Sequence, residues 1–151
     1  MRTVTIGIGL PGSGKTTALK KFAARDRTYY ISVDDLRKEK TGNANDQSRN
    51  SEVWAITYQL IHAALDLDRD VVIDATNAKK PDRIKLIAHC RQKADRIIWI
   101  WFTPSYEVCL LRNQNRDRVV PDFPIGLMAG WLEAHPPALS EGFDQLRKFV
   151  P

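Results

Sequence analysis

The apolar residues of this chain fall into short unbroken runs that alternate with longer stretches of mixed polarity. Runs of five to seven residues rich in β-branched and aromatic side chains are typical of strands buried in a parallel sheet. Such runs predict strands at Thr3–Ile8, Tyr29–Val33, Val71–Ala75, Arg96–Phe102 and Leu146–Val150.

Apolar residues in the intervening stretches recur three and four positions apart, which is the spacing of one helix face. The clearest case runs from Arg49 to about Asp68, with Val53, Ile56, Leu60, Ala64 and Leu67 on that face. Further helices are expected at Thr16–Arg25, from Asp34, from Pro81 to about Ala94, from Pro104 towards Arg116, and at Asp122–Ala134.

The helix that Pro81 opens has its own repeat, because proline is favoured in a first helical turn. Its matching positions are Ile84, Ile87, Ala88 and Arg91, which we expect on the inner face. The stretch Thr41–Ser48 (TGNANDQS) has no repeat and is expected to be a mobile polar loop.

Strands therefore alternate with helices along the whole sequence. This order predicts an α/β fold with a parallel sheet, helices on both faces and right-handed crossovers. Ligands of such sheets bind beyond the carboxyl ends of the strands, so the chemistry should follow the first four strands. No repeat or interdomain linker interrupts the 151 residues, and we expect one domain spanning 1–151.

A complete phosphate-binding motif follows the first predicted strand. Residues 9–16 read GLPGSGKT, which matches G-x-x-x-x-G-K-[ST] between a strand and a helix. Glycines let the backbone N–H groups surround phosphate oxygens, the lysine reaches the β- and γ-phosphates, and the hydroxyl that follows is placed to bind Mg²⁺. ATP and Mg²⁺ are therefore the expected cofactors, held by Gly12, Ser13, Gly14, Lys15, Thr16 and Thr17.

An acidic and a basic residue follow the second strand. Asp34 and Arg37 lie three positions apart at a predicted helix start, and therefore on one helix face. A phosphotransferase needs a carboxylate to take the proton of the acceptor hydroxyl and a nearby cation for the transferred group. The alternative is that Asp34 and Asp35 only cap the helix.

The third strand ends in Asp74, as in Walker-B segments, where the aspartate holds the water shell of Mg²⁺. We therefore expect Thr16 and Asp74 to form the metal site. Ala75 stands where many hydrolytic ATPases have a water-activating glutamate, which argues against a motor. The sequence also lacks the N-K-x-D motif that reads guanine, which argues against a GTPase switch.

Several arginines lie at the end of the helix predicted from Pro104 and directly after it. Arg112 and Arg116 are four positions apart, so a helix would present both on one side. Cations in this place would stabilise the charge on the transferred phosphoryl group from a lid at residues 112–122. A solvated basic helix end is the alternative. On the first interpretation Lys15, Asp34, Arg37 and Arg116 are the catalytic residues, and Arg112 and Arg116 also bind the nucleotide.

Composition narrows the choice of partners. The chain has 23 Lys and Arg against 18 Asp and Glu, a net charge of +5, which favours a polyanionic acceptor such as nucleic acid. Cys90 and Cys109 have neither disulfide nor zinc-site spacing and are expected on buried helix faces. The first apolar run is too short for a signal peptide or a membrane span, so we expect a cytoplasmic protein that does not contact membranes.

Taken together, these motifs resemble the polynucleotide kinase branch of the P-loop kinases, the kinase domain of phage and bacterial 5′-end-healing enzymes. GLPGSGKTT resembles the phosphate loop of that family, and VDDLR resembles its R-D-D-x-R segment. The resemblance implies a three-layer fold with strand order 2-3-1-4-5. It also implies that Asp34 is the general base, that Arg37 contacts the acceptor phosphate and that Arg116 contacts the ATP phosphates.

The similarity extends over nearly the whole chain but includes two departures. DATN followed by Arg83 is similar to the family's D-x-N-x-x-x-x-x-R region, although Asp74 stands one place earlier than the family's acid. The lid is one residue shorter between Arg112 and Pro121, which leaves Arg118 as an alternative to Arg116. The segment EGFD, Glu141–Asp144, also recurs in related small kinases without an evident chemical role.

Three functions remain open at this point. The first is a kinase acting on a nucleic-acid hydroxyl, either a 5′-OH end or a hydroxymethyl group on a pyrimidine within DNA. The second is a kinase for a nucleoside, sugar or antibiotic, and the third is an ATP-binding regulatory module that transfers nothing. Aromatic side chains that could stack on an unpaired base are Tyr29, Tyr30, Trp54 and Tyr58.

Overall fold

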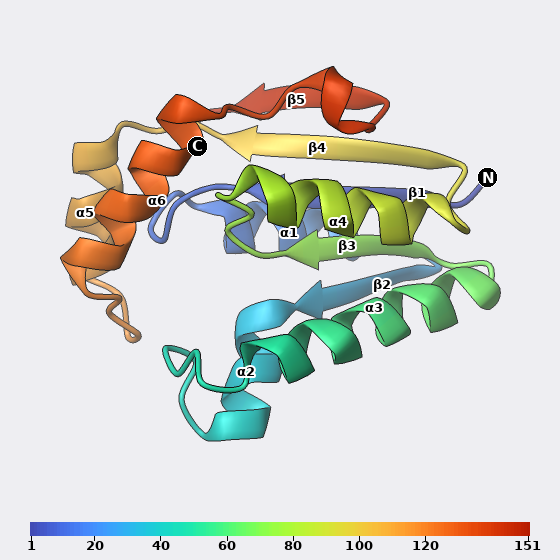
Figure 1. Ribbon diagram of the computed structural model, residues 1–151, viewed down its shortest axis with the longest axis horizontal. Helices are drawn as coiled ribbons and strands as arrows, with labels where there is room; N and C mark the ends of the chain where they lie inside the picture. The colour runs from blue at the N-terminus through green and yellow to red at the C-terminus, as the bar shows by residue number, and fades with distance from the viewer.

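The computed structural model describes residues 1–151 as a five-stranded parallel sheet flanked by helices (Figure 1). The strand order is β2-β3-β1-β4-β5, which confirms the order that the family resemblance implies. The strands are β1 (Thr3–Ile8), β2 (Thr28–Ser32), β3 (Asp70–Asp74), β4 (Arg96–Phe102) and β5 (Gln145–Phe149).

All six predicted α-helices are present, and their ends lie within three residues of the expected positions. A short 3₁₀ helix at Leu139–Glu141, which the sequence pattern did not predict, precedes the last strand. The α-helices are α1 (Lys15–Ala23), α2 (Val33–Thr41), α3 (Asn50–Asp66), α4 (Lys80–Arg91), α5 (Tyr106–Gln114) and α6 (Asp122–Ala134).

One face of the sheet carries the main hydrophobic core. The strand residues Val4, Ile6 and Ile8 are fully buried there beneath α3 and α4, which cross this face in Figure 1. Helices α5 and α6 lie near the carboxyl ends of the strands and contribute Cys109 and Ile125 to the same core. Burial of these apolar side chains holds α5 and α6 near the carboxyl ends of the strands.

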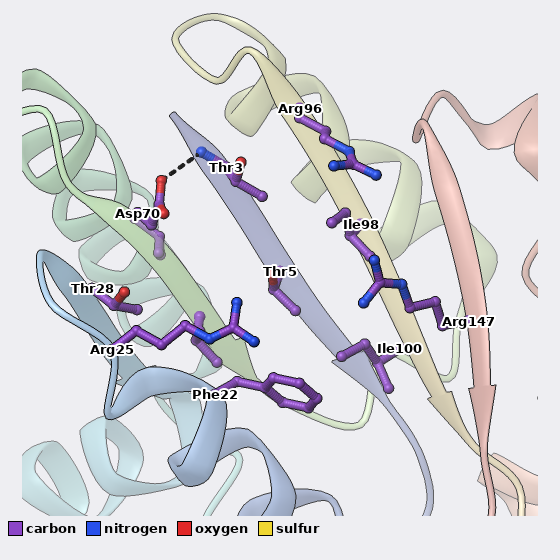
Figure 2. Close-up of a pocket in the computed structure, with 12 residues that line it drawn as sticks. Thr3, Thr5, Phe22, Arg25, Thr28, Asp70, Arg96, Ile98, Ile100 and Arg147 are labelled. Carbon is purple, nitrogen blue, oxygen red and sulfur yellow. Dashed lines mark hydrogen bonds between the residues drawn. The ribbon is translucent and has the colours of Figure 1, made fainter. Parts of the chain in front are cut away.

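The opposite face is covered mainly by α1, where Leu19 packs in a smaller cluster with Val72 and Ile98. Figure 2 shows the part of this face beyond the end of α1, where β1 presents Thr3 and Thr5 instead of valine and isoleucine. A hollow of about 200 Å³ lies here, and Arg25, Arg96 and Arg147 line it. Threonines thus alternate with apolar residues along β1. Thr3 and Thr5 point to the thinly covered face, and Val4 and Ile6 point to the core.

Two predicted helix faces need correction. In α4 the buried residues are Arg83, Leu86, Ile87 and Cys90, whereas Ile84, Ala88 and Arg91 are exposed. Apolar spacing predicts the wrong inner face for α4, because Arg83 occupies one of the buried positions. In α3 the repeat is right at Val53 and Ala64, but Thr57, Ile61 and Leu65 take the other inner positions and Leu67 is 68% exposed.

The two cysteines lie where the sequence predicts, on buried faces of α4 and α5. Burial raises the pKa of Cys90 to about 12 and raises the pKa of Cys109 as well. None of the helices is both long enough and apolar enough to cross a membrane.

Candidate active site

The loop between β1 and α1 has the backbone shape that the glycine pattern predicts. Gly12 and Gly14 have φ values of 83° and 86°, in the left-handed region where a β-carbon is strained. A β-carbon on Gly12 would also collide with the Cys109 carbonyl, because the loop packs directly on α5. The loop and α5 are therefore in direct contact.

This loop forms one side of a pocket of about 210 Å³. Its walls are Gly12–Thr17 together with Arg112 and Arg116, the residues predicted to hold the nucleotide phosphates. Lys15 is only 7% exposed. Two buried polar atoms, Ser13 Oγ and Arg116 Nη1, have no hydrogen-bond partner. Unpartnered buried donors of this kind are costly, so the pocket suits an anionic ligand such as the phosphates of a nucleotide.

Arg116 reaches this pocket by a route that differs from the prediction. Helix α5 ends at Gln114, so Arg116 lies in the loop after the helix and does not continue the helix face of Arg112. Burial lowers the pKa of Arg116, and Arg118 lowers it further, whereas the charges of Asp34 and Asp74 act in the opposite direction. The guanidinium thus lies in a partly dry site near both carboxylates.

Asp74 ends β3 beside the phosphate loop, and its Oδ2 atom accepts two hydrogen bonds. Thr16 Oγ1 donates from 2.7 Å and Tyr30 Oη donates from 2.6 Å. Burial raises the pKa of Tyr30 well above its usual range, and the hydrogen bond to Asp74 raises it further. A threonine hydroxyl next to a buried carboxylate provides the hard oxygen ligands that Mg²⁺ prefers, so this donor set fits the metal.

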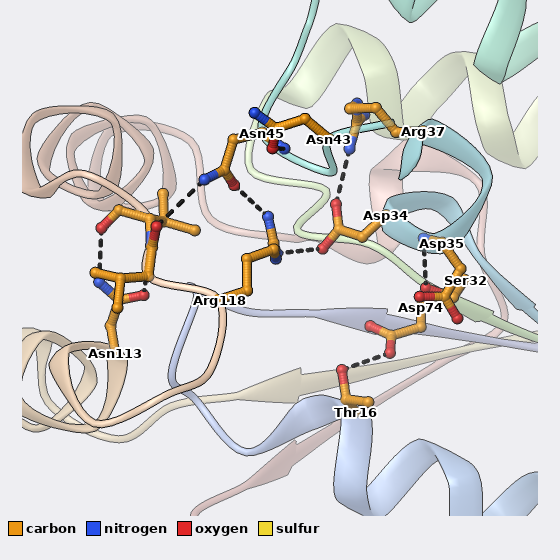
Figure 3. Close-up of polar contacts among 12 residues, drawn as sticks. Thr16, Ser32, Asp34, Asp35, Arg37, Asn43, Asn45, Asp74, Asn113 and Arg118 are labelled. Atoms are coloured by element: carbon orange, nitrogen blue, oxygen red, sulfur yellow. Dashed lines mark hydrogen bonds and ion pairs between the residues drawn. The ribbon is translucent and has the colours of Figure 1, made fainter. Parts of the chain in front are cut away.

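Asp34 stands at the start of α2, across from the loop, and each of its carboxylate oxygens pairs with a different arginine (Figure 3). Arg37 Nη1 lies 2.7 Å from Oδ1, and Arg118 Nη2 lies 2.7 Å from Oδ2. The helix cap is Ser32, whose side chain accepts a hydrogen bond from the Asp35 N–H. The alternative that Asp34 caps the helix is therefore wrong, and the carboxylate points to the site.

The polar stretch before α3 contacts the loop between α5 and α6. The Asn45 side chain accepts a hydrogen bond from Arg118 and donates one to the Val119 carbonyl at 3.2 Å, as Figure 3 shows. Asn113 is fully buried in α5. Its side-chain nitrogen donates to the Val120 carbonyl, and its side-chain oxygen accepts from the Val120 N–H. Two asparagines thus hold the loop between α5 and α6 over the site.

A second and larger pocket, of about 390 Å³, opens on the other side of Lys15. Its polar residues include Asp34, Arg37 and Arg118, and its apolar wall includes Trp54 and Trp131. Lys15 lines both pockets, so the two meet at this residue. A ligand hydroxyl in the larger pocket would face the end of a phosphate chain in the smaller one.

The remaining aromatic candidates lie elsewhere. Tyr58 stacks on His89 with ring centroids 3.8 Å apart, in contact with neither pocket, and Tyr29 packs against the main core. Of the four aromatic residues considered for base stacking, only Trp54 lines the larger pocket. Trp131, which the sequence pattern did not single out, lines it too and has Lys79 Nζ 4.5 Å from its ring centroid.

Arg83 and the EGFD segment form a buried structural link. Arg83 Nε lies 2.7 Å from Glu141 Oε1, and the two side chains are 0% and 1% exposed. The same guanidinium donates to the carbonyls of Asn77, Ala78 and His135. This network ties the loop after β3, which lines the larger pocket, to the segment before β5.

A family model described as an AAA domain matches residues 4–133. No curated protein matches the sequence. A chain of the Pnkp1/Rnl/Hen1 RNA repair complex aligns with a TM-score of 0.79 at 23% identity, over 95% of this chain and 46% of that one. The present chain thus spans less than half the length of that relative.

Two other solved structures have the same fold. Kti12 from Chaetomium thermophilum, in complex with ADP-AlF3, aligns with a TM-score of 0.68 at 18% identity, over 97% of this chain and 88% of that one. A gluconokinase from Sinorhizobium meliloti 1021 aligns with a TM-score of 0.64 at 18% identity, over 98% and 83% of the two chains. At these identities the likeness shows the fold alone.

Proposed function

The chain belongs to the AAA domain family and has the P-loop kinase fold, and from this premise we propose that it transfers the γ-phosphate of ATP to a hydroxyl of a nucleic acid. The simplest acceptor is the 5′-OH end of a polynucleotide. The observation that carries the proposal is the meeting of two pockets at Lys15, with Asp34 and two arginines on the acceptor side.

On the donor side, the backbone of Gly12–Thr17 and the side chains of Lys15, Arg112 and Arg116 bind the phosphates of ATP. Thr16 and Asp74 would hold Mg²⁺, which neutralises charge on the phosphates when it is bound. Lys15 and Arg116 stabilise the negative charge that develops on the transferred group, and the partial burial of Arg116 strengthens that effect.

On the acceptor side, Asp34 takes the proton of the attacking hydroxyl. The acceptor oxygen forms a bond to the γ-phosphorus, the bond from that phosphorus to the β,γ-bridging oxygen breaks, and ADP leaves with the bond's electron pair. Arg37 and Arg118, which pair with Asp34 in this structure, bind the phosphate next to the acceptor hydroxyl. An acceptor that recruits these arginines frees the carboxylate to act as a base.

Four features support a nucleic-acid acceptor. The chain has a net charge of +5, and the acceptor pocket combines arginines with tryptophans, which suits a phosphate next to a base. VDDLR resembles the acceptor segment of polynucleotide kinases. A structurally similar chain belongs to an RNA repair complex. In this proposal residues 1–151 form one kinase domain with a lid at 112–122.

A small-molecule acceptor is the second candidate, and the size of the pocket favours it. A volume of about 390 Å³ is enough for one nucleoside or sugar, and the fold is shared with a gluconokinase. A flipped hydroxymethylpyrimidine within DNA would use the same enclosed space. The catalytic residues would be the same in each case, so only an acceptor assay separates them.

The test offers γ-labelled ATP with a panel of acceptors. The panel contains a 5′-OH oligonucleotide, the same oligonucleotide with a 5′-phosphate, 5′-phosphorylated DNA containing hydroxymethyluracil, nucleosides and gluconate. We expect label on the 5′-OH strand and none on its 5′-phosphorylated twin. Label on the modified DNA alone would support base phosphorylation, and label only on nucleosides or gluconate would overturn the nucleic-acid proposal.

A further inference from the structure

Tyr30 makes a contact that neither the motif pattern nor the proposed transfer step requires. It lies on β2, two residues before the Ser32 cap, and its hydroxyl donates to Asp74 Oδ2 at 2.6 Å. In the register of β2 and β3, Tyr30 is opposite Val72 and Ser32 is opposite Asp74, so Tyr30 projects from the face that α1 covers. The hydroxyl therefore reaches the carboxylate from the side of the edge strand.

Two hydroxyl groups donate hydrogen bonds to the same carboxylate oxygen of Asp74. Thr16 Oγ1 and Tyr30 Oη each have one proton, and both donate to Oδ2. An ionised carboxylate oxygen has about two lone-pair sites, so Oδ2 is saturated and Oδ1 is the oxygen left for another partner. Because the proton of Thr16 points to Asp74, the lone pairs of its hydroxyl oxygen are also available to a cation.

We propose that Tyr30 is a positioning residue that fixes the orientation of the Asp74 carboxylate for the divalent cation of the bound nucleotide. The inference rests on the proposed identity of this site as a Mg²⁺–nucleotide site. Outer hydrogen bonds of this kind orient carboxylate ligands, and their loss typically weakens metal affinity by about 10- to 100-fold. Without Tyr30, only Thr16 would restrain Asp74.

A purely structural role for Tyr30 makes a different prediction. The ring packs in the small cluster with Leu19 and Val72, and Tyr30→Phe keeps this ring and removes only the hydroxyl. Tyr29→Phe is the matched control, since Tyr29 is the next residue on the same strand and packs instead against the main core. If the hydroxyl served only to fill space, the two variants would behave alike.

The experiment measures Mn²⁺ binding by electron paramagnetic resonance in the presence of saturating ADP, and ADP binding in EDTA by calorimetry. We expect Tyr30→Phe to weaken Mn²⁺ binding about tenfold and to leave ADP binding in EDTA at the wild-type value. Tyr29→Phe should leave both unchanged. In an Asp74→Ala background, Tyr30→Phe should have no further effect on Mn²⁺ binding, because the side chain that accepts the Tyr30 hydrogen bond is gone.

Mn²⁺ affinity within twofold of wild type in Tyr30→Phe would overturn the inference. An equal loss of ADP affinity in EDTA would also overturn it, because that result would mean a general disturbance of the loop. Neither readout involves phosphoryl transfer. A failed search for the acceptor would therefore leave this test intact, and a failed metal test would leave the proposed transfer to nucleic acid standing.

Discussion

At Asp34 each carboxylate oxygen accepts a hydrogen bond from a different arginine, one in the same helix and one in the lid. The charge of the proposed base is thus compensated from two sides. In the proposed mechanism, an acceptor phosphate would compete with Asp34 for Arg37 and Arg118, so binding of the correct substrate would change the surroundings of the base. This exchange would link recognition of the acceptor to the proton transfer.

Replacement of Asp34 by asparagine tests this role directly. Asp34→Asn should lower the rate of phosphoryl transfer by at least about 100-fold, because the amide cannot take a proton. ADP affinity should stay the same. The control is Asp35→Asn, which removes the same charge from the neighbouring, exposed position. Unchanged turnover in Asp34→Asn would support an ATP-binding module without a transfer base.

Substitutions of Arg116 and Arg118 should have different kinetic effects, because the two side chains line different pockets. Arg116→Ala should lower kcat by about 100-fold or more, as expected for a cation that stabilises the transferred group. Arg118→Ala should raise the KM of the acceptor and leave the KM of ATP unchanged. Steady-state kinetics with each substrate varied in turn measures both. If the two variants had the same profile, this division of roles would be wrong.

The sequence predicts which residues line the smaller pocket, because most of them lie in one short motif. The contacts of Tyr30 and Asn45 with Asp74 and Arg118 cross 44 and 73 positions of sequence, and no local pattern encodes them. Tyr30 left one weak signal, since it alternates with Ser32 on a strand that leads into the site. Asn45 lies in a polar stretch without any repeat and left none.

At the scale of elements, alternating strand and helix patterns predict the order and most boundaries of the secondary structure. The inner face of α4 could not be predicted by apolar spacing, because Arg83 occupies it. A buried arginine is stable only with a full set of partners, and those partners come from the segment between α6 and β5. Hydrophobic periodicity contains no information about such a partner.

The Arg83–Glu141 pair therefore makes a prediction about stability. Arg83→Ala leaves Glu141 buried without its charge partner and should lower the free energy of unfolding by about 3–5 kcal/mol. Arg91→Ala, the control in the same helix, removes a partly exposed pair with Asp144 and should cost about 1 kcal/mol or less. Urea unfolding monitored by tryptophan fluorescence measures both. Equal losses of unfolding free energy in the two variants would mean that the buried pair contributes no more stability than the exposed one.

At the scale of the whole molecule, the charge distribution matters more than the fold for the choice of acceptor. The same fold occurs in a gluconokinase and in a chain of an RNA repair complex, so the architecture alone does not select a substrate. The features of this chain that bear on the choice of acceptor are the net charge of +5 and the pair of arginines at Asp34.

This charge predicts a salt dependence. If Arg37 and Arg118 together neutralise the phosphate next to the acceptor hydroxyl, the affinity for a 5′-OH oligonucleotide should fall about threefold when salt rises about fourfold. A neutral nucleoside acceptor should respond much less. Acceptor KM measured at saturating ATP over a series of salt concentrations gives the slope. An oligonucleotide KM that does not change with salt would mean that phosphate contacts do not contribute to acceptor binding.

The central claim is that a nucleic-acid hydroxyl receives the γ-phosphate, and a competition assay tests it most directly. Equimolar 5′-OH oligonucleotide and free nucleoside share one reaction with limiting γ-labelled ATP, and the products are separated by size. We expect nearly all the label to enter the oligonucleotide. Arg118→Ala should shift the ratio of labelled oligonucleotide to labelled nucleoside towards the nucleoside. Label found mainly in the nucleoside would contradict it.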